Sequence, residues 1–157
     1  MPRFKRARDS GVRVRLGADE VELLRRLAAE MRTMLLAHES EDPVMQRLFP
    51  DAHTGAAEAA EFRALTEDDL GAAKLAALDK MTGSLETEGG LDVTLEAADV
   101  DSWLSVLTDL RLAIGARLDV TEKLMSSDVD PGDRRAPALA TLHWLGWLQE
   151  MLLRAAG

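Results

Sequence analysis

The sequence predicts an α+β fold that is predominantly helical, with about four main helices and a small antiparallel or mixed sheet. Several segments repeat apolar residues at steps of three and four, which is the spacing of one helix face. An N-terminal segment and a segment near Val93 instead alternate apolar with polar residues, as half-buried strands do. The length of 157 residues is typical of one domain, so we treat 1–157 as a single unit.

The first 16 residues form a basic segment that predicts a β-hairpin. Val12–Leu16 alternates apolar residues with arginines, and Asp9–Gly11 supplies turn-forming residues just before it. Phe4–Arg8 can then fold back and pair with Val12–Leu16.

The remaining body, residues 19–157, is expected to be mainly helical. Thr66 and the three acidic residues after it predict a helix start, because a threonine cap and an acidic first turn favour a helix N-terminus. Residues 51–65 fit either a loop or a loose helix, and residues 126–137 predict a charged surface loop. The expected elements are a helix over 19–38, a helical turn over 43–49, a helix over 66–86, a strand over 91–95, a helix from the 96–101 region to about 118 and a helix over 137–155.

The sequence also resembles itself when it is shifted by 79 residues. Identical or similar residues then coincide, including Val14 with Val93, Leu16 with Leu95 and Arg32 with Arg111. Both copies predict a strand, a tight acidic turn and an amphipathic helix. One interpretation is a duplicated strand–helix unit whose two strands share a sheet. The other is that any strand–helix pair with one buried face produces such a pattern.

Charge is distributed unevenly along the chain. Residues 1–15 contain six basic residues and one acid, a charge of +5, so the rest carries −14 of the total of −9. An acidic body repels nucleic acid, so any DNA contact would have to use the basic end. The candidate nucleic-acid patch comprises Arg6, Arg8, Arg13 and Arg15. The alternative is that these arginines simply form the solvated face of a strand.

The residue pattern argues against an enzyme. Cysteine is absent, which excludes disulfides, cysteine–zinc sites and thiol nucleophiles within this chain. Phosphate-binding glycine loops and a G-x-S-x-G nucleophile motif are also missing. His38, His53 and His143 do not have metal-ligand spacing. We therefore expect no catalytic residue, cofactor or metal. No apolar run approaches a membrane span and the N-terminus does not resemble a secretory signal, so we expect a cytoplasmic protein with no membrane partner.

Two groups of residues in the last third are candidate interaction sites. Asp109 lies in the helix expected to be most buried, so it needs a cation, which we expect from Arg111, Arg117 or Arg32. The resulting buried ion pair would either fix helix packing or form a ligand or switch site. The second group shares one face of the last helix and is expected to belong to the core or to a partner or dimer interface: Trp144, Trp147, Leu148 and Met151.

Three segments carry a resemblance to a known family. The segment from Trp103 to Leu118 resembles the signature W-L-x-x-L-x-D-L-R-L-x-x-G-x-R-L, and Trp144–Glu150 resembles the ending W-L-x-W-L-Q-E. Phe62–Leu70, followed by Ala73-Lys74-Leu75, is similar as well. The family is an actinobacterial domain of unknown function that includes AosR-type oxidative-stress transcriptional regulators.

The resemblance implies a non-enzymatic regulator that acts by protein–protein contact with the transcription machinery, through a sigma factor or RNA polymerase. In the AosR type, redox sensing would use a cysteine pair, and this chain has none, so a disulfide switch cannot operate within it. The resemblance leaves two alternatives open: an accessory or adaptor protein linked to Clp-dependent proteolysis, and a DNA-contacting regulator that uses the basic hairpin. A homodimer is also compatible with the sequence.

Overall fold

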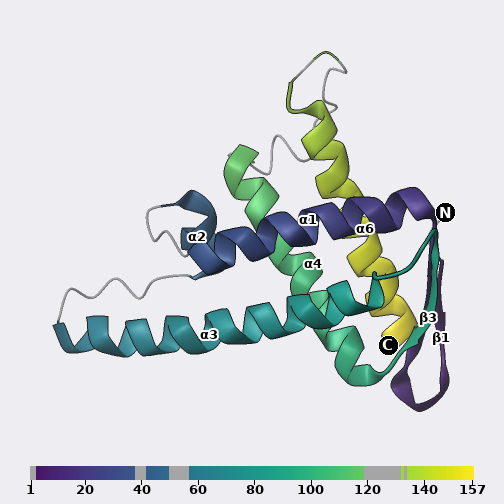
Figure 1. Cartoon of the computed structure of the whole chain (residues 1–157), viewed down its shortest axis with the longest axis horizontal. Helices are drawn as coiled ribbons and strands as arrows, with labels where there is room; N and C mark the ends of the chain where they lie inside the picture. The colour runs from purple at the N-terminus through teal and green to yellow at the C-terminus, as the bar shows by residue number, and fades with distance from the viewer. Residues whose placement is uncertain (1–2, 38–41, 50–56, 119–131, 133) are drawn as a thin grey trace.

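The computed structural model describes residues 3–37, 42–49, 57–118, 132 and 134–157, with the backbone alone over 57–67. It confirms a predominantly helical α+β fold with a small sheet at one end of the helices (Figure 1). The elements are β1 (Arg3–Arg6), η1 (Arg8–Ser10), β2 (Val12–Leu16), α1 (Ala18–Ala37), α2 (Pro43–Leu48), α3 (Ala57–Ser84), β3 (Leu91–Leu95), α4 (Ala97–Leu118) and α6 (Ala136–Ala156).

The sheet has the order β1-β2-β3, and both of its strand pairs are antiparallel. The predicted hairpin and the predicted third strand are therefore both present. In β2 the residues Val12, Val14 and Leu16 are buried, whereas Arg13 and Arg15 are exposed. The sheet consequently has an inner face against the helices and an outer face in solvent, which is the usual arrangement of a half-buried antiparallel sheet.

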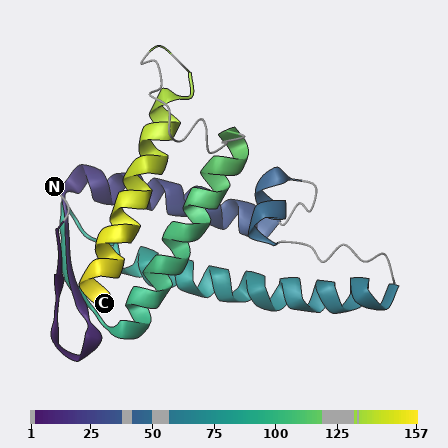
Figure 2. The same cartoon turned by 180° about the vertical axis from the view of Figure 1, so that it is seen from behind.

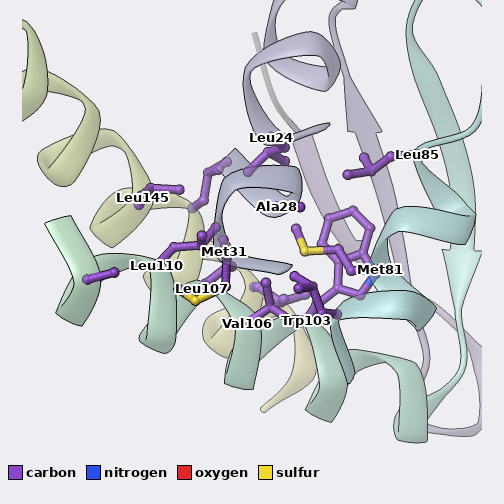
Figure 3. Packing of buried hydrophobic residues seen from close by; sticks show 14 of the residues in the cluster. Leu24, Ala28, Met31, Met81, Leu85, Trp103, Val106, Leu107, Leu110 and Leu145 are labelled. Carbon is purple, nitrogen blue, oxygen red and sulfur yellow. The ribbon is translucent and has the colours of Figure 1, made fainter. Parts of the chain in front are cut away.

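Helix α4 is the central element of the helical part, and it packs against α2, α3 and α6. Seen from behind, α4 and α6 cross the long α1 (Figure 2). Trp103 of α4 is 1% exposed and lies close to Met81 of α3 and Ala28 of α1 (Figure 3). The sequence predicted apolar residues on more than one face of this helix. In the structure these faces pack against several helices at once.

One predicted helix start is wrong. We expected a helix to begin at Thr66, but α3 begins at Ala57 and passes through Thr66 without interruption. The alanine-rich segment before Thr66 has high helix propensity, which favours extending the helix over starting a new one. Residues 57–65 are therefore helical, while residues 51–56 of the undetermined segment lie outside the described residues. Most of the predicted loop over 126–137 also lies outside them.

The two copies of the 79-residue repeat meet in the sheet. Strand β2 leads into α1, β3 leads into α4, and the two strands are neighbours in which Val14 pairs with Val93. The buried residues of the two helices also occupy matching positions. These pairs are Val21 and Val100, Leu24 and Trp103, Ala28 and Leu107, and Met31 and Leu110. The expectation that the two strands share a sheet is confirmed.

Candidate interaction surfaces

The outer face of the sheet gathers four cations, which we call the basic sheet face: Arg3, Lys5, Arg13 and Arg15. Arg3 lies opposite Arg15, and Lys5 lies opposite Arg13, so each pair projects from the same side of β1 and β2. All four residues are exposed. Like charges directly opposite each other on a sheet are unfavourable. An anionic group placed beside these cations would therefore be favourable.

Asp92 of β3 supplies one anionic neighbour. Its carboxylate accepts two hydrogen bonds from Arg13, from Nε at 2.9 Å and from Nη2 at 2.8 Å. This pairing lowers the pKa of Asp92 and raises the pKa of Arg13. Arg15 approaches the same carboxylate with Nε at 3.8 Å. Among the described residues, Arg3 and Lys5 form no ion pair, so the basic sheet face keeps a surplus of positive charge.

The structure divides the nucleic-acid patch expected from the sequence. Arg13 and Arg15 lie on the basic sheet face. Arg6 is paired with Val12 and projects toward the other side of the sheet, and Arg8 lies in η1. Sequence reasoning missed Arg3 and Lys5 as members of the surface. The signal that could have identified them is strand alternation, because every second residue of β1 lies on the same side of the sheet as every second residue of β2.

Asp109 is buried at 7% exposure and forms an ion pair, with Lys74 of α3 as its partner. Lys74 Nζ donates to Asp109 Oδ1 at 2.8 Å, and it also lies 6.0 Å from the centroid of the Phe49 ring. Burial raises the pKa of Asp109, while the hydrogen bond and the positive charge of Lys74 act in the opposite direction. The pair connects α3 to α4 and lies beside the end of α2.

The expectation of an arginine partner for Asp109 is wrong. Arg111 follows Asp109 by two positions on a helix, and residues with that spacing do not face each other. Arg111 instead donates to Gln149 of α6, Arg117 pairs with Asp42, and Arg32 pairs with Asp79. Lys74 was already present in the family resemblance, but its pairing with Asp109 spans two helices and has no local sequence signal.

Arg111 belongs to a polar network between α4 and α6. Its Nη1 donates to Gln149 Oε1 at 2.8 Å, and Gln149 Nε2 donates to the hydroxyl of Thr108. A Cβ placed on Gly146 would lie 3.4 Å from Arg111 Nε, so the guanidinium lies directly against the backbone of α6. The network thus joins the W-L-x-x-L-x-D-L-R-L segment to the W-L-x-W-L-Q-E segment. These residues act together in helix packing.

The tryptophan face expected on α6 is partly buried within the protein. Leu148 is 1% exposed and belongs to the core, and Trp144 packs against that core. Met151 is partly buried, whereas Trp147 remains 40% exposed. Leu148 is therefore unavailable to a partner of the folded chain. Trp147 is the most accessible member of the four.

The part of the chain that the structure describes contains no cluster of three or more His, Cys, Asp or Glu residues that could hold a metal ion. His143 is exposed, while His38 and His53 fall outside the described residues. No helix in the described ranges is sufficiently long and apolar to span a bilayer. Besides the basic sheet face, the described ranges expose five large apolar residues: Leu36, Leu70, Leu112, Trp147 and Leu153.

Comparison with known proteins identifies the family of the chain. A model described as "Domain of unknown function (DUF2017)" matches residues 1–156. A relative from Mycobacterium leprae, named "Putative oxidative stress regulator AosR", is 31% identical over 134 residues. The match covers 76% of this chain and 60% of the relative, so the chain spans less than two thirds of that protein's length. No solved structure matches the chain. The chain belongs to the DUF2017 family.

Proposed function

We propose that this protein is a non-enzymatic regulator of the oxidative-stress response that acts by contact with the transcription machinery, through a sigma factor or RNA polymerase. The observation that carries the proposal is the similarity to the Mycobacterium leprae protein, within a family match over nearly the whole chain. The exposed basic sheet face and Trp147 support a binding role, because exposed arginine and tryptophan side chains are enriched at the centres of protein interfaces.

The absence of cysteine limits how such a regulator receives its signal. A thiol–disulfide switch requires two cysteines, and this chain has none. The proposal therefore assigns oxidant sensing to a partner, and it assigns binding to this chain.

The test combines a physical and a genetic measurement in the host that encodes the chain. The tagged protein is purified from cells grown with and without peroxide, and the proteins that accompany it are identified against a tagged unrelated acidic protein. Transcription after peroxide is then compared between the parent strain and a deletion strain. Enrichment of a sigma factor or RNA polymerase, together with an altered response in the deletion strain, supports the proposal.

Three other results would contradict it. Enrichment of Clp subunits would indicate a role in proteolysis. Binding of purified protein to duplex DNA, without a protein partner, would indicate a direct DNA contact through the hairpin. An unchanged transcriptional response in the deletion strain would remove the regulatory role.

A further inference from the structure

The outer edge of β1 has no strand partner among the residues that the structure describes. Among the described residues, β1 pairs with β2 alone, and no other backbone hydrogen bond involves residues 3–6. Three of the four β1 residues are exposed. An edge strand of this kind presents unpaired N–H and C=O groups, to which an extended segment of another chain can add.

We propose that this edge, together with the basic sheet face, binds an extended acidic segment of a partner protein as a further strand. Arg3 and Lys5 lie two positions apart in β1 and project to the outer side of the sheet. In an added strand, alternate residues would lie about 4.5–5.5 Å from them across the edge. Acidic residues at every second position would therefore meet Arg3 and Lys5, with Arg13 and Arg15 in the next row.

The end of the sheet provides additional room for anionic groups. An open pocket of about 510 Å³ is lined there by Arg3, Arg15 and Asp92, with Leu16, Gly17, Gly90 and Leu91. Arg3 has no ion-pair partner among the described residues, and Arg15 approaches Asp92 at 3.8 Å. Arg3 lies two strands away from Asp92, so a carboxylate entering the pocket beside Arg3 would accept hydrogen bonds from that guanidinium.

The observations favour an acidic protein segment over nucleic acid. A strand edge offers donors and acceptors in alternation, and a peptide backbone satisfies both, whereas a phosphodiester backbone supplies acceptors alone. The four cations of the basic sheet face lie on two strands only. The chain beyond residue 15 carries a net charge of −14, which repels a long polyanion such as nucleic acid. The other edge strand, β3, places Asp92 on the outer face, where it would repel an acidic segment.

The identity of the protein that carries the acidic segment rests on the proposed function. The binding itself can be measured with purified protein. The probe is a fluorescein-labelled peptide of about eight residues in which glutamate alternates with valine, a length typical of strands. Fluorescence anisotropy at increasing salt gives its dissociation constant. We expect binding that weakens as salt is raised, because exposed charge pairs are screened.

A double variant, Arg3→Gln with Lys5→Gln, should weaken binding about tenfold, since two exposed charge pairs together contribute on the order of 1–2 kcal/mol. The matched control is Arg26→Gln with Arg47→Gln, which removes the same charge from exposed positions on α1 and α2. The control should bind as the unmodified protein does. Circular dichroism verifies that both variants are folded.

Two further probes separate the contributions of charge and backbone. A peptide with glutamine in place of glutamate tests charge, and a peptide N-methylated at alternate residues tests strand addition. Both should bind more weakly than the original. Three results would overturn the inference. They are tighter binding of duplex DNA of equal charge, equal binding of the N-methylated peptide, and no peptide binding at low salt. If the peptide binds but neither a sigma factor nor RNA polymerase is enriched from cells, the binding role of the β1 edge is supported and the proposed partner is rejected.

Discussion

Gly11 and Gly90 stand 79 residues apart and occupy equivalent positions in the sheet. A Cβ on Gly11 would lie 2.7 Å from the carbonyl oxygen of Leu95, and a Cβ on Gly90 would lie 2.7 Å from the carbonyl oxygen of Leu16. Leu16 and Leu95 are themselves 79 residues apart. Each glycine thus precedes one strand and packs against the end of the other. The two copies of the repeat share this local geometry as well as their sequence pattern.

We expect Gly11→Ala and Gly90→Ala to destabilise the protein by similar amounts, about 1–3 kcal/mol each, because the added methyl group must displace backbone. Urea unfolding followed by circular dichroism measures the change. Gly115→Ala is the control, since nothing lies within 4 Å of a Cβ there. In the interior of α4 this control should stabilise by about 0.5–1 kcal/mol. A Gly11→Ala variant with unchanged stability would contradict the close approach of Gly11 to the carbonyl oxygen of Leu95.

The ion pair between Lys74 and Asp109 predicts an asymmetric set of variants. Asp109→Ala should cost about 3–5 kcal/mol, because it leaves Lys74 as a buried charge without its partner. The double variant Lys74→Met with Asp109→Leu should be far less destabilised, since both charges are removed together. Thermal unfolding of the variants tests this. A double variant as unstable as Asp109→Ala would show that packing, and not charge, causes the loss.

The same carboxyl group predicts a pH dependence. The pKa of Asp109 lies above its ordinary value of 3.8, chiefly because of burial, so the folded protein binds the proton more readily than the unfolded chain. The associated stability is fully present below the unfolded value and is lost as the pH rises through the folded-state pKa. The unmodified protein should therefore gain stability relative to Asp109→Asn as the pH is lowered from neutral toward 3.8. Urea unfolding at several pH values measures this difference. If the unmodified protein instead loses stability relative to Asp109→Asn as the pH is lowered, the effect of Lys74 on the pKa of Asp109 outweighs that of burial.

The network between Arg111 and Gln149 should show energetic coupling. Arg111→Met, Gln149→Leu and the double variant form a double-mutant cycle, for which we expect a coupling of about 0.5–3 kcal/mol because the two residues share a hydrogen bond. The exposed pair Arg154–Glu150 provides the comparison, with about 0–1 kcal/mol expected. Equal coupling energies in the two cycles would argue against a role for Arg111 in joining α4 to α6.

Adjacent residues of α6 should respond differently to truncation. Leu148→Ala should cost about 2–5 kcal/mol, because it leaves a cavity in the core. Trp147→Ser should cost much less, as Trp147 is 40% exposed. Thermal unfolding measures both costs, and light scattering on Trp147→Ser reports whether this residue contributes to self-association. A Trp147→Ser variant that fails to fold would place Trp147 in the core.

Much of the fold was predictable because it is encoded in local patterns. The alternation in Val12–Leu16 and the three- and four-residue spacing of α1 identify a strand and a helix, since each reflects one buried face. The start of α3 was predicted wrongly for a reason that is also local. A threonine followed by acids resembles a helix cap, but it does not stop a helix that alanine-rich sequence has already begun.

The candidate sites depended on contacts between distant parts of the chain. The sequence predicted that Asp109 is buried, that a hairpin carries the basic residues and that the last helix has an apolar face. The folded structure assigned Lys74 to Asp109, placed Arg3 and Lys5 beside Arg13 and Arg15, and buried Leu148 while leaving Trp147 exposed. Periodicity defines which face of an element is buried, because it follows from helix and strand geometry. The residue that meets that face depends on strand register and helix packing, which bring together side chains as distant in the chain as Arg13 and Asp92, 79 residues apart.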